Sequence, residues 1–511
     1  MSFPDNLKLE KIHSLYAWVE YVASGKRPKG FKGATVYADN LRLAKSNAPK
    51  PAGLIEAFQI LPADYGWSEL AKKITPVPER KFPRTTGPVK QLGPVILPSL
   101  GYGRRAYMFG GPFGTGGDYG TKVYRNIAAY DNKRILLIVD PGRIFATYDG
   151  GETWKGIDGS TGPTLVKTWS NHAGVGGDGL SGDAYIIIRS TRNMKTSKQD
   201  GTISLAGFSK ASCHGGGNLN IMSLRLLRFR GDKWALGSEV MLDHHVRHCP
   251  GNPGAVVLRL ESGRVWSFWH SDTNIQGGIH INGKYSDDQG INWKFPSRYP
   301  SIQGTKKMYV NYFYAFPYKD RVAVIWNQRD NNLPVMWSYF DGKEFSSPQS
   351  VAGKASVQSA AALQNGTVYA AMKPIRGKNL KLYIRIFDGK EWKTGTVLDD
   401  ASSGSIRSVS MTRSKDKLFC FWIRLEKKDE KNIWAVLYSY RNTDGVWSKP
   451  ITISRQTEGI HRIVTPDISP NDYIPVFWDS SVSTKNRKPE WYKDLWVRFA
   501  RVPSDKPWEE K

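Results

Sequence analysis

The feature that most constrains the fold is a recurring turn, in which Asp-Gly is followed within a few residues by an aromatic residue. Three copies begin at Asp341, Asp388 and Asp444, so consecutive copies are 47 and 56 residues apart. Each follows a short run of apolar, β-branched and aromatic residues, which is typical of a β-strand. This spacing corresponds to one four-stranded blade of a β-propeller, which has about 40 to 50 residues. The sequence therefore predicts a propeller of consecutive blades.

The composition also favours an all-β fold. The 511 residues include 50 Gly, 29 Pro, 18 Trp and 24 Tyr, and 40% of them are hydrophobic. Gly and Pro supply turns, Trp and Tyr favour strands, and the hydrophobic share is large enough for an extensive core. We therefore exclude disorder as the dominant state of the chain.

Counting pairs of apolar strands that end in such a turn gives seven units, and six is the alternative count. The units cover residues 120–156, 165–242, 245–296, 306–350, 353–398, 403–452 and 460–502. We expect a seven-bladed propeller over residues 116–511. The apolar segment 91–100 is expected to add a strand that closes the ring, because an edge strand would otherwise stay unpaired.

Residues 1–115 differ from the rest and are expected to form an N-terminal extension. Apolar residues at helical spacing in 12–26 predict one short amphipathic helix, which Gly25 would end. The segments 26–33 and 75–90 are basic and rich in Pro, which indicates extended arms that lie on another surface.

Two turns fit a stricter pattern, S/T-x-D-x-G-x-x-W, at residues 147–154 and 286–293. In such a turn the Asp side chain bonds nearby backbone N–H groups, Gly takes a left-handed conformation, and Trp fills the gap between sheets. The pattern resembles the Asp box, or BNR repeat, of the sialidase-like propeller superfamily. The resemblance implies a sialidase-like propeller in which the residues of these turns are structural and do not take part in catalysis: Asp149, Trp154, Asp288 and Trp293.

The densest group of titratable residues lies at 243–272. Four of the nine histidines of the chain are there: His244, His245, His248 and His270. Three interpretations of the His-rich part are open. It is a solvated basic loop, a metal site formed by His244, His248 and Cys249, or part of a catalytic site. Only Asp243 adds a carboxylate nearby, which disfavours the metal site. We expect no metal and no other cofactor, while a structural or carboxylate-bridging divalent cation stays open.

Residues around this cluster resemble the BNR-type propellers that include ulvan lyases and rhamnosyl-glucuronate-cleaving enzymes. The resemblance is carried by Asn252-Pro253, Gly263-Arg264, Phe268 and His270, followed by the second S/T-x-D-x-G-x-x-W turn. It implies two histidines that face the central cleft. The later one is His270. The earlier one is His248, although an inserted Cys-Pro-Gly before Asn252 leaves His244 and His245 as alternatives to His248.

The next unit, 311–342, resembles the following blade of the same lyases and offers Tyr312 or Tyr314 together with Arg329. The resemblance implies lyase-type cleavage of an acidic polysaccharide beside a uronate. His248 or His270 would be the base, Arg329 would bind the carboxylate, and Tyr312 would be the acid or a hydrogen-bond partner. Further residues expected to bind substrate are His172, Arg125, His245 and Arg247.

A sialidase-like exo-glycoside hydrolase is the second interpretation. Tyr124-Arg125 stands near the place where sialidases have Tyr-Arg-Ile-Pro, but Asn126-Ile127 replaces the Ile-Pro. Other arginines of a carboxylate-binding set would be Arg329, Arg407 or Arg462, and the sequence does not choose among them. A propeller without catalysis, used as a glycan-binding or structural module in a virion or surface assembly, is the third interpretation.

Charge points to the class of partner. The chain has 73 Lys and Arg against 46 Asp and Glu, a net charge of +27. A positive field of this size attracts polyanions, so we expect an acidic polysaccharide or another anionic glycan as the partner. There is no specific nucleic-acid motif and no apolar run of the roughly 18 residues that a membrane span needs. We expect an extracellular or surface-associated protein, although no signal peptide is visible in this chain.

Overall fold

The computed structural model describes part of the chain between residues 84 and 509. The described residues are 84–87, 89–97, 127–139, 143–165, 173–177, 184–196, 203–208, 218–230, 233–244, 255–271, 280–290, 292–297, 300, 310–328, 334–375, 381–400, 404–428, 431–460, 462–469, 472–481 and 495–509. All regular secondary structure in these residues is β-strand, which confirms the all-β prediction. The helix predicted at 12–26 lies outside the described residues.

The described strands form seven sheets, numbered 1 to 7 here in chain order. Sheet 1 contains β2 (Ile127–Ala129), β3 (Ile135–Val139), β4 (Arg143–Thr147) and β5 (Thr164–Leu165). Sheet 2 contains β6 (Ala173–Gly177), β7 (Ala184–Thr196), β9 (Asn218–Arg230) and β10 (Lys233–His244), with β8 (Ile203–Phe208) paired to β7. Sheet 3 contains β11 (Ala255–Arg259), β12 (Val265–Ser271) and β13 (His280–Ser286).

Sheet 4 contains β14 (Val310–Tyr318), β15 (Arg321–Gln328), β16 (Val335–Tyr339) and β17 (Gln349–Ala352). Sheet 5 contains β18 (Ala355–Ala362), β19 (Val368–Pro374), β20 (Leu382–Phe387) and β21 (Trp392–Asp399). Sheet 6 contains β22 (Gly404–Ser414), β23 (Lys417–Lys428), β24 (Lys431–Arg441) and β25 (Ile451–Gln456). Sheet 7 contains β26 (Ile463–Val464), β27 (Tyr473–Ser481), β28 (Leu495–Pro503) and β1 (Leu92–Ile96).

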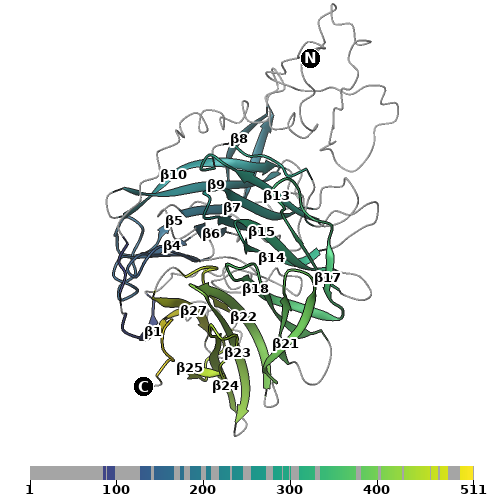
Figure 1. Ribbon diagram of the computed structural model, residues 1–511. Helices are drawn as coiled ribbons and strands as arrows, with labels where there is room; N and C mark the ends of the chain where they lie inside the picture. The colour runs from purple at the N-terminus through teal and green to yellow at the C-terminus, as the bar shows by residue number, and fades with distance from the viewer. Residues whose placement is uncertain are drawn as a thin grey trace, which may run out of the picture.

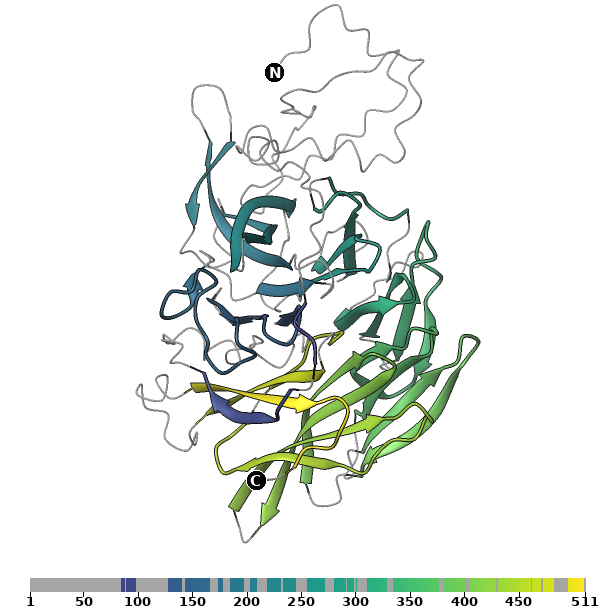
Figure 2. The ribbon, with the colours of Figure 1, turned by 60° about the vertical axis from the view of Figure 1, so that its left-hand side comes forward.

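The sheets pack face to face around a ring, and the last sheet packs against the first (Figures 1 and 2). Apolar clusters join sheets 1 and 2, 3 and 4, 4 and 5, 5 and 6, and 6 and 7, while β6 of sheet 2 lies beside β11 of sheet 3. Six of the seven sheets have the four or more strands of a complete propeller blade, and sheet 3 has three described strands. The chain therefore folds as a β-propeller, as predicted.

Packing on both faces explains why the strands are apolar runs instead of alternating patterns. In β15, six consecutive residues, Val322 to Asn327, are buried. Val322, Val324 and Trp326 pack toward sheet 3, whereas Ala323 and Ile325 pack toward sheet 5. A strand buried on both faces needs apolar residues at nearly every position.

The innermost strands of the sheets run in the same direction along the ring axis. Side chains of β22 bond the backbone near β26 at a constant separation of 55 residues, through Ser408, Ser410 and Thr412. A constant offset of this kind requires parallel neighbours. We call the edge of the ring where the innermost strands begin the N-rim, and the edge where they end the C-rim. The innermost strands are β2, β6, β11, β14, β18, β22 and β26.

Ring closure uses the N-terminal segment. β1 lies within the segment 91–100 and pairs antiparallel with β28, so that Val95 faces Phe499. At the C-rim, the Asp472 carboxylate accepts hydrogen bonds from the Gly87 N–H at 2.8 Å and from Asn132 Nδ2 at 2.8 Å. The Asp472 N–H in turn donates to Asn132 Oδ1 at 3.0 Å. Segments more than 300 residues apart in sequence are therefore tied together where sheets 1 and 7 meet.

We expect acid to weaken this closure through Asp131, whose side chain is only 1% exposed. Burial by itself would raise the pKa of Asp131, but bonds from Arg134 and from the Thr85 and Lys133 N–H groups outweigh it and hold the pKa below its usual value. The stabilisation is therefore complete above about pH 4 and is lost as the pH falls below that value. Asp131→Asn should lower the free energy of unfolding by about 1 to 3 kcal/mol at neutral pH. The difference from wild type should shrink at pH 3 in urea titrations, and an unchanged difference there would contradict the assignment.

Candidate functional site

Chain order connects every residue that the sequence predicts for catalysis or substrate binding to a described strand end at the N-rim. Arg125 stands two positions before β2, and His172 directly precedes β6. His245, Arg247 and His248 occur in the connection from β10 to β11. Each of these connections joins a described strand end at the N-rim, because β2, β6 and β11 are innermost strands that begin there.

The remaining candidates lie in strands of sheets 3 and 4 or directly follow one in sequence. His270 is the penultimate residue of β12, whose last residues pair with the start of β11 through Trp269 and Ala255. Tyr312 lies near the start of β14 and pairs with Asn327. Arg329 directly follows β15 in sequence. The second strand of each sheet runs from the C-rim to the N-rim, so both β12 and β15 end at the N-rim.

The structure describes these candidates to different extents. The strands that hold His270 and Tyr312 are described, but their side chains are not among the described ones. Six predicted residues lie outside the described residues: Arg125, His172, His245, Arg247, His248 and Arg329. Their assignment to the N-rim therefore remains a prediction from chain order.

Of the two tyrosines that the sequence offers, Tyr314 is too buried to contact a substrate. Tyr314 is 4% exposed and packs in the apolar cluster between sheets 4 and 5. Asn327, the partner of Tyr312, is 3% exposed and ties the end of β15 to sheet 5. Its Nδ2 donates to the Ala355 carbonyl at 2.8 Å, and its Oδ1 accepts from the Val357 N–H at 3.0 Å. The strand end that precedes Arg329 is thus held rigidly against the next sheet.

Sequence reasoning missed part of the N-rim on sheets 5 and 6. Lys373 at the end of β19 and Trp434 near the start of β24 lie there, together with Arg407 of β22. The sequence presented Arg407 only as one of three interchangeable arginines. No local pattern marks these three residues, because they come from three strands and meet only in the assembled ring.

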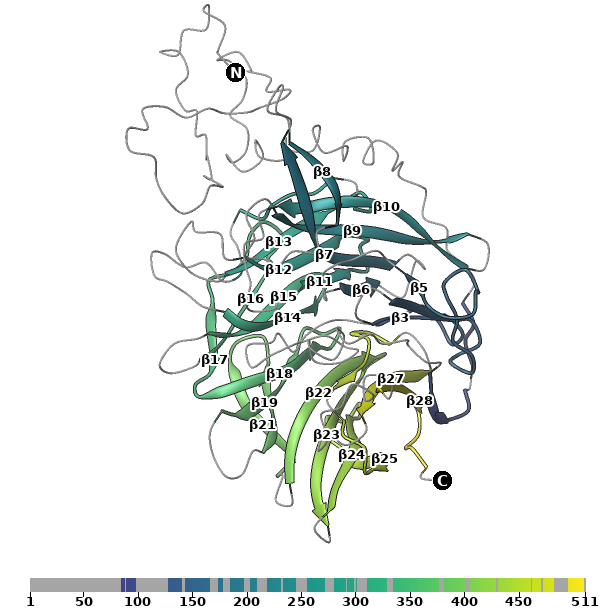
Figure 3. The same ribbon diagram turned by 180° about the vertical axis from the view of Figure 1, so that it is seen from behind.

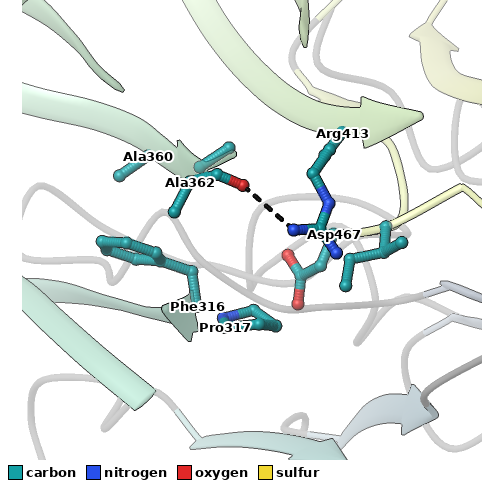
Figure 4. Close-up of a pocket in the computed structure, with 8 residues that line it drawn as sticks. Phe316, Pro317, Ala360, Ala362, Arg413 and Asp467 are labelled. Carbon is teal, nitrogen blue, oxygen red and sulfur yellow. Dashed lines mark hydrogen bonds between the residues drawn. The ribbon is translucent and has the colours of Figure 1, made fainter. Parts of the chain in front are cut away.

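The opposite edge holds a small pocket at the ring axis, formed where β14, β18 and β22 end (Figure 4). It is lined in part by Phe316, Ala362, Arg413 and Asp467. Its cavity volume of about 10 Å³ is enough for about one water molecule, so this pocket is too small for a sugar unit. None of the predicted catalytic residues borders it.

Arg413, which lines this pocket, forms an ion pair with Glu261. Its side chain is 8% exposed, and its guanidinium lies 3.5 Å from Glu261 Oε1 and 3.5 Å from the Ala362 carbonyl oxygen. Glu261 lies in the turn between β11 and β12 of sheet 3, and Arg413 lies in β22 of sheet 6, so the ion pair joins sheets that are not neighbours. Burial lowers the pKa of Arg413, and the charge of Glu261 opposes that shift. A partly buried ion pair therefore lies beside this pocket at the C-rim.

The two S/T-x-D-x-G-x-x-W turns also lie at the C-rim and have the same hydrogen bonds. Asp149 Oδ1 accepts from Thr147 Oγ1 at 2.7 Å and from the Thr153 N–H at 3.0 Å. In the second turn, Asp288 Oδ1 accepts from Ser286 Oγ at 2.7 Å and from the Asn292 N–H at 2.8 Å. Both carboxylates are occupied by their own turns, on the edge opposite the candidate site.

The aromatic residues of these turns close them. Trp154 Nε1 donates to the Gly151 carbonyl at 3.2 Å, and Trp293 Nε1 donates to the Gly290 carbonyl at 2.9 Å. Trp154 and Trp293 are 4% and 7% exposed. Gly151 and Gly290 have φ values of 99° and 85°, a region that L side chains rarely adopt. This geometry is the one expected from the pattern.

The described part of the chain contains no group of three or more His, Cys, Asp or Glu side chains that could hold a metal ion. None of its segments is a helix that is long and apolar enough to cross a membrane. Cys420 is a buried free thiol, and burial raises its pKa. A thiol in this state does not act as a nucleophile.

Comparisons with known proteins find similarity only at the level of structure. No known family model matches the sequence, and a search of curated proteins finds no match. The structure of YCF48 bound to D1 peptide has a TM-score of 0.40 and 13% identity, covering 81% of this chain and 98% of that chain. The polysaccharide lyase Uly1 has a TM-score of 0.43 and 9% identity, covering 79% of this chain and 94% of that one. Trypanosoma rangeli sialidase in complex with sialic acid has a TM-score of 0.35 and 11% identity, covering 64% of this chain and 53% of that chain.

Proposed function

We propose that the protein binds an acidic polysaccharide at the N-rim and cleaves it by elimination beside a uronate. The observation that carries this proposal is the topology. The described strand ends next to all eight predicted residues lie at one edge of the ring, where residues from sheets 1 to 4 can act on one sugar. Residues of a catalytic site must lie within hydrogen-bond reach of the same substrate.

The chemistry needs three groups, and the N-rim candidates include all of them. His248 or His270 removes the proton from the carbon next to the carboxylate. Arg329 binds that carboxylate and stabilises the negative charge that develops on it. Tyr312 gives a proton to the oxygen that leaves as the glycosidic bond breaks. The electron pair of the broken C–H bond becomes the new C=C bond, so the reaction needs no oxidant and no water.

Charge supports an anionic substrate. The net charge of +27 attracts polyanions, and one connection that joins described strand ends at the N-rim is itself basic. This connection, residues 482–494, carries Lys485, Arg487, Lys488 and Lys493 against Glu490 and Asp494. Focusing of positive charge at one edge would raise the local concentration of an acidic polymer.

A screen of acidic polysaccharides tests the proposal. A lyase should produce the ultraviolet absorbance of a C=C bond conjugated to a carboxylate, together with new reducing ends. New reducing ends without the absorbance would instead indicate a hydrolase of the sialidase-like kind. Binding without either product would support a non-catalytic glycan-binding propeller, and absence of both binding and products would overturn the carbohydrate assignment.

A further inference from the structure

A bulge in the innermost strand of sheet 6 exposes a cation at the N-rim. The pairing of β22 with β23 shifts between Ile406 and Val409, so Arg407 and Ser408 form the irregular part. Ser408 is 7% exposed, and its Oγ accepts the Ile463 N–H of sheet 7 at 3.2 Å. Arg407 is exposed. Bulges often re-aim a side chain beside a functional site, and here the neighbouring residue anchors the bulge.

Sheet 5 holds the other side of the bulge. Lys373 Nζ donates a hydrogen bond of 2.8 Å to the Ile406 carbonyl, the peptide group that precedes Arg407. The bulge is therefore fixed from both neighbouring sheets. The same contact brings a second positive charge beside Arg407.

Arg407 has an aromatic neighbour and no acidic partner among the described residues. Its guanidinium carbon lies 6.0 Å from the centre of the Trp434 ring. Among the described residues, Arg407 has no carboxylate within ion-pair distance, which leaves its charge uncompensated. Three other arginines of sheets 6 and 7 illustrate the contrast, because each has an acidic partner: Arg424 with Asp399 and Glu426, Arg455 with Glu426, and Arg498 with Glu458.

We infer that Lys373, Arg407 and Trp434 form a second subsite for the polysaccharide, on a different part of the N-rim from the predicted cleavage residues of sheets 3 and 4. In it, Arg407 binds the carboxylate of a sugar unit other than the one cleaved. The planar guanidinium fork matches a carboxylate in two hydrogen bonds, and an exposed cation without an acidic partner keeps this capacity. Trp434 is a positioning residue that holds the guanidinium. This inference rests on the proposed function.

The test measures binding of the full-length protein to polygalacturonate, a carboxylated polymer, at low salt. Arg407→Ala should weaken binding about tenfold or more, because a charge-assisted hydrogen bond is lost. Arg407→Lys should recover only part of the loss, since it keeps the charge without the fork. Trp434→Ala should also weaken binding, and Trp434→Phe, which keeps a ring, should weaken it less.

Arg441→Ala is the matched control. Arg441 also belongs to sheet 6 and lies over an aromatic ring, 5.1 Å from the centre of Tyr369, but it is at the C-rim end of β24. Equal binding by the Arg407→Ala and Arg441→Ala variants would overturn the subsite. If Arg407→Ala weakens binding to dextran sulfate as much as it weakens binding to polygalacturonate, the assignment of Arg407 to a carboxylate is wrong. If the wild-type protein binds no polyanion, the proposed function itself is wrong. This outcome differs from the two above, in which the wild-type protein binds and only the subsite or its ligand is wrong.

Discussion

Trp154→Ala should cost about 3 to 5 kcal/mol of unfolding free energy, the usual loss when a large buried aromatic side chain is removed. The Trp154 ring lies 5.3 Å from Phe477 and 5.4 Å from Phe499, both in edge-to-face geometry. These contacts join sheet 1 to sheet 7, where the ring closes. The substitution therefore leaves a cavity at the interface between the first and last sheets. Packing between distant parts of the chain holds this interface together.

Urea unfolding of the purified variants measures this effect. Trp392→Ala is the control, because Trp392 is only partly buried and packs against Trp337 within sheets 4 and 5, away from ring closure. The control should lose less stability. A loss below about 1 kcal/mol for Trp154→Ala would mean that the neighbouring rings fill the space, and that the turn contributes little to closure.

His270→Ala and Arg329→Ala should each lower turnover of a cleaved acidic polysaccharide by at least about 100-fold, the scale expected for loss of a general base or of an electrostatic stabiliser. Neither change should alter the thermal unfolding temperature appreciably, because both residues are predicted to act on the substrate and not in the core. The measurement is kcat from the ultraviolet absorbance of the product, with the Arg441→Ala variant as the control from the C-rim.

The pattern of these rates separates the possible roles. If His270→Ala retains wild-type turnover while the same change at His248 abolishes it, His248 is the base. If both histidine variants and Arg329→Ala retain full activity on a substrate that the wild type cleaves, the site assignment is wrong. A loss of activity that accompanies a lower unfolding temperature would indicate damage to the fold instead of a catalytic role.

The N-rim also differs from the C-rim in how its polar groups are used. At the C-rim, the carboxylates of Asp149, Asp288 and Asp472 are held by hydrogen bonds from backbone or neighbouring side chains. Arg413 is likewise engaged by Glu261. The exposed and uncompensated Arg407 lies at the N-rim. These four polar groups of the C-rim therefore stabilise the ring, whereas Arg407 keeps an uncompensated charge at the N-rim.

Figure 3 shows a further difference between the sheets that sequence spacing did not predict. β7 extends beyond the short innermost strand β6 and pairs there with β8, which forms a hairpin that projects from the body of the ring. The second predicted unit, 165–242, was longer than the others, but its length alone did not indicate where the additional strand would lie.

The sequence by itself determined the fold class and the local turns. Runs such as 321–328 and 416–425 have the apolar composition of strands buried on both faces, and the two S/T-x-D-x-G-x-x-W turns depend only on contacts within eight residues. Local chemistry of this kind can be read from a single sequence because the residues that interact are neighbours in the chain.

Tertiary structure alone decided how the ring closes and which strand ends meet at each of its edges. The pairing of β1 with β28 joins segments about 400 residues apart, and the Arg413 to Glu261 contact joins sheets that are not neighbours. The bulge that exposes Arg407 is fixed by Ser408 and Lys373 through contacts with two other sheets. Such contacts depend on the relative placement of whole sheets, and no periodicity or motif in the chain records that placement.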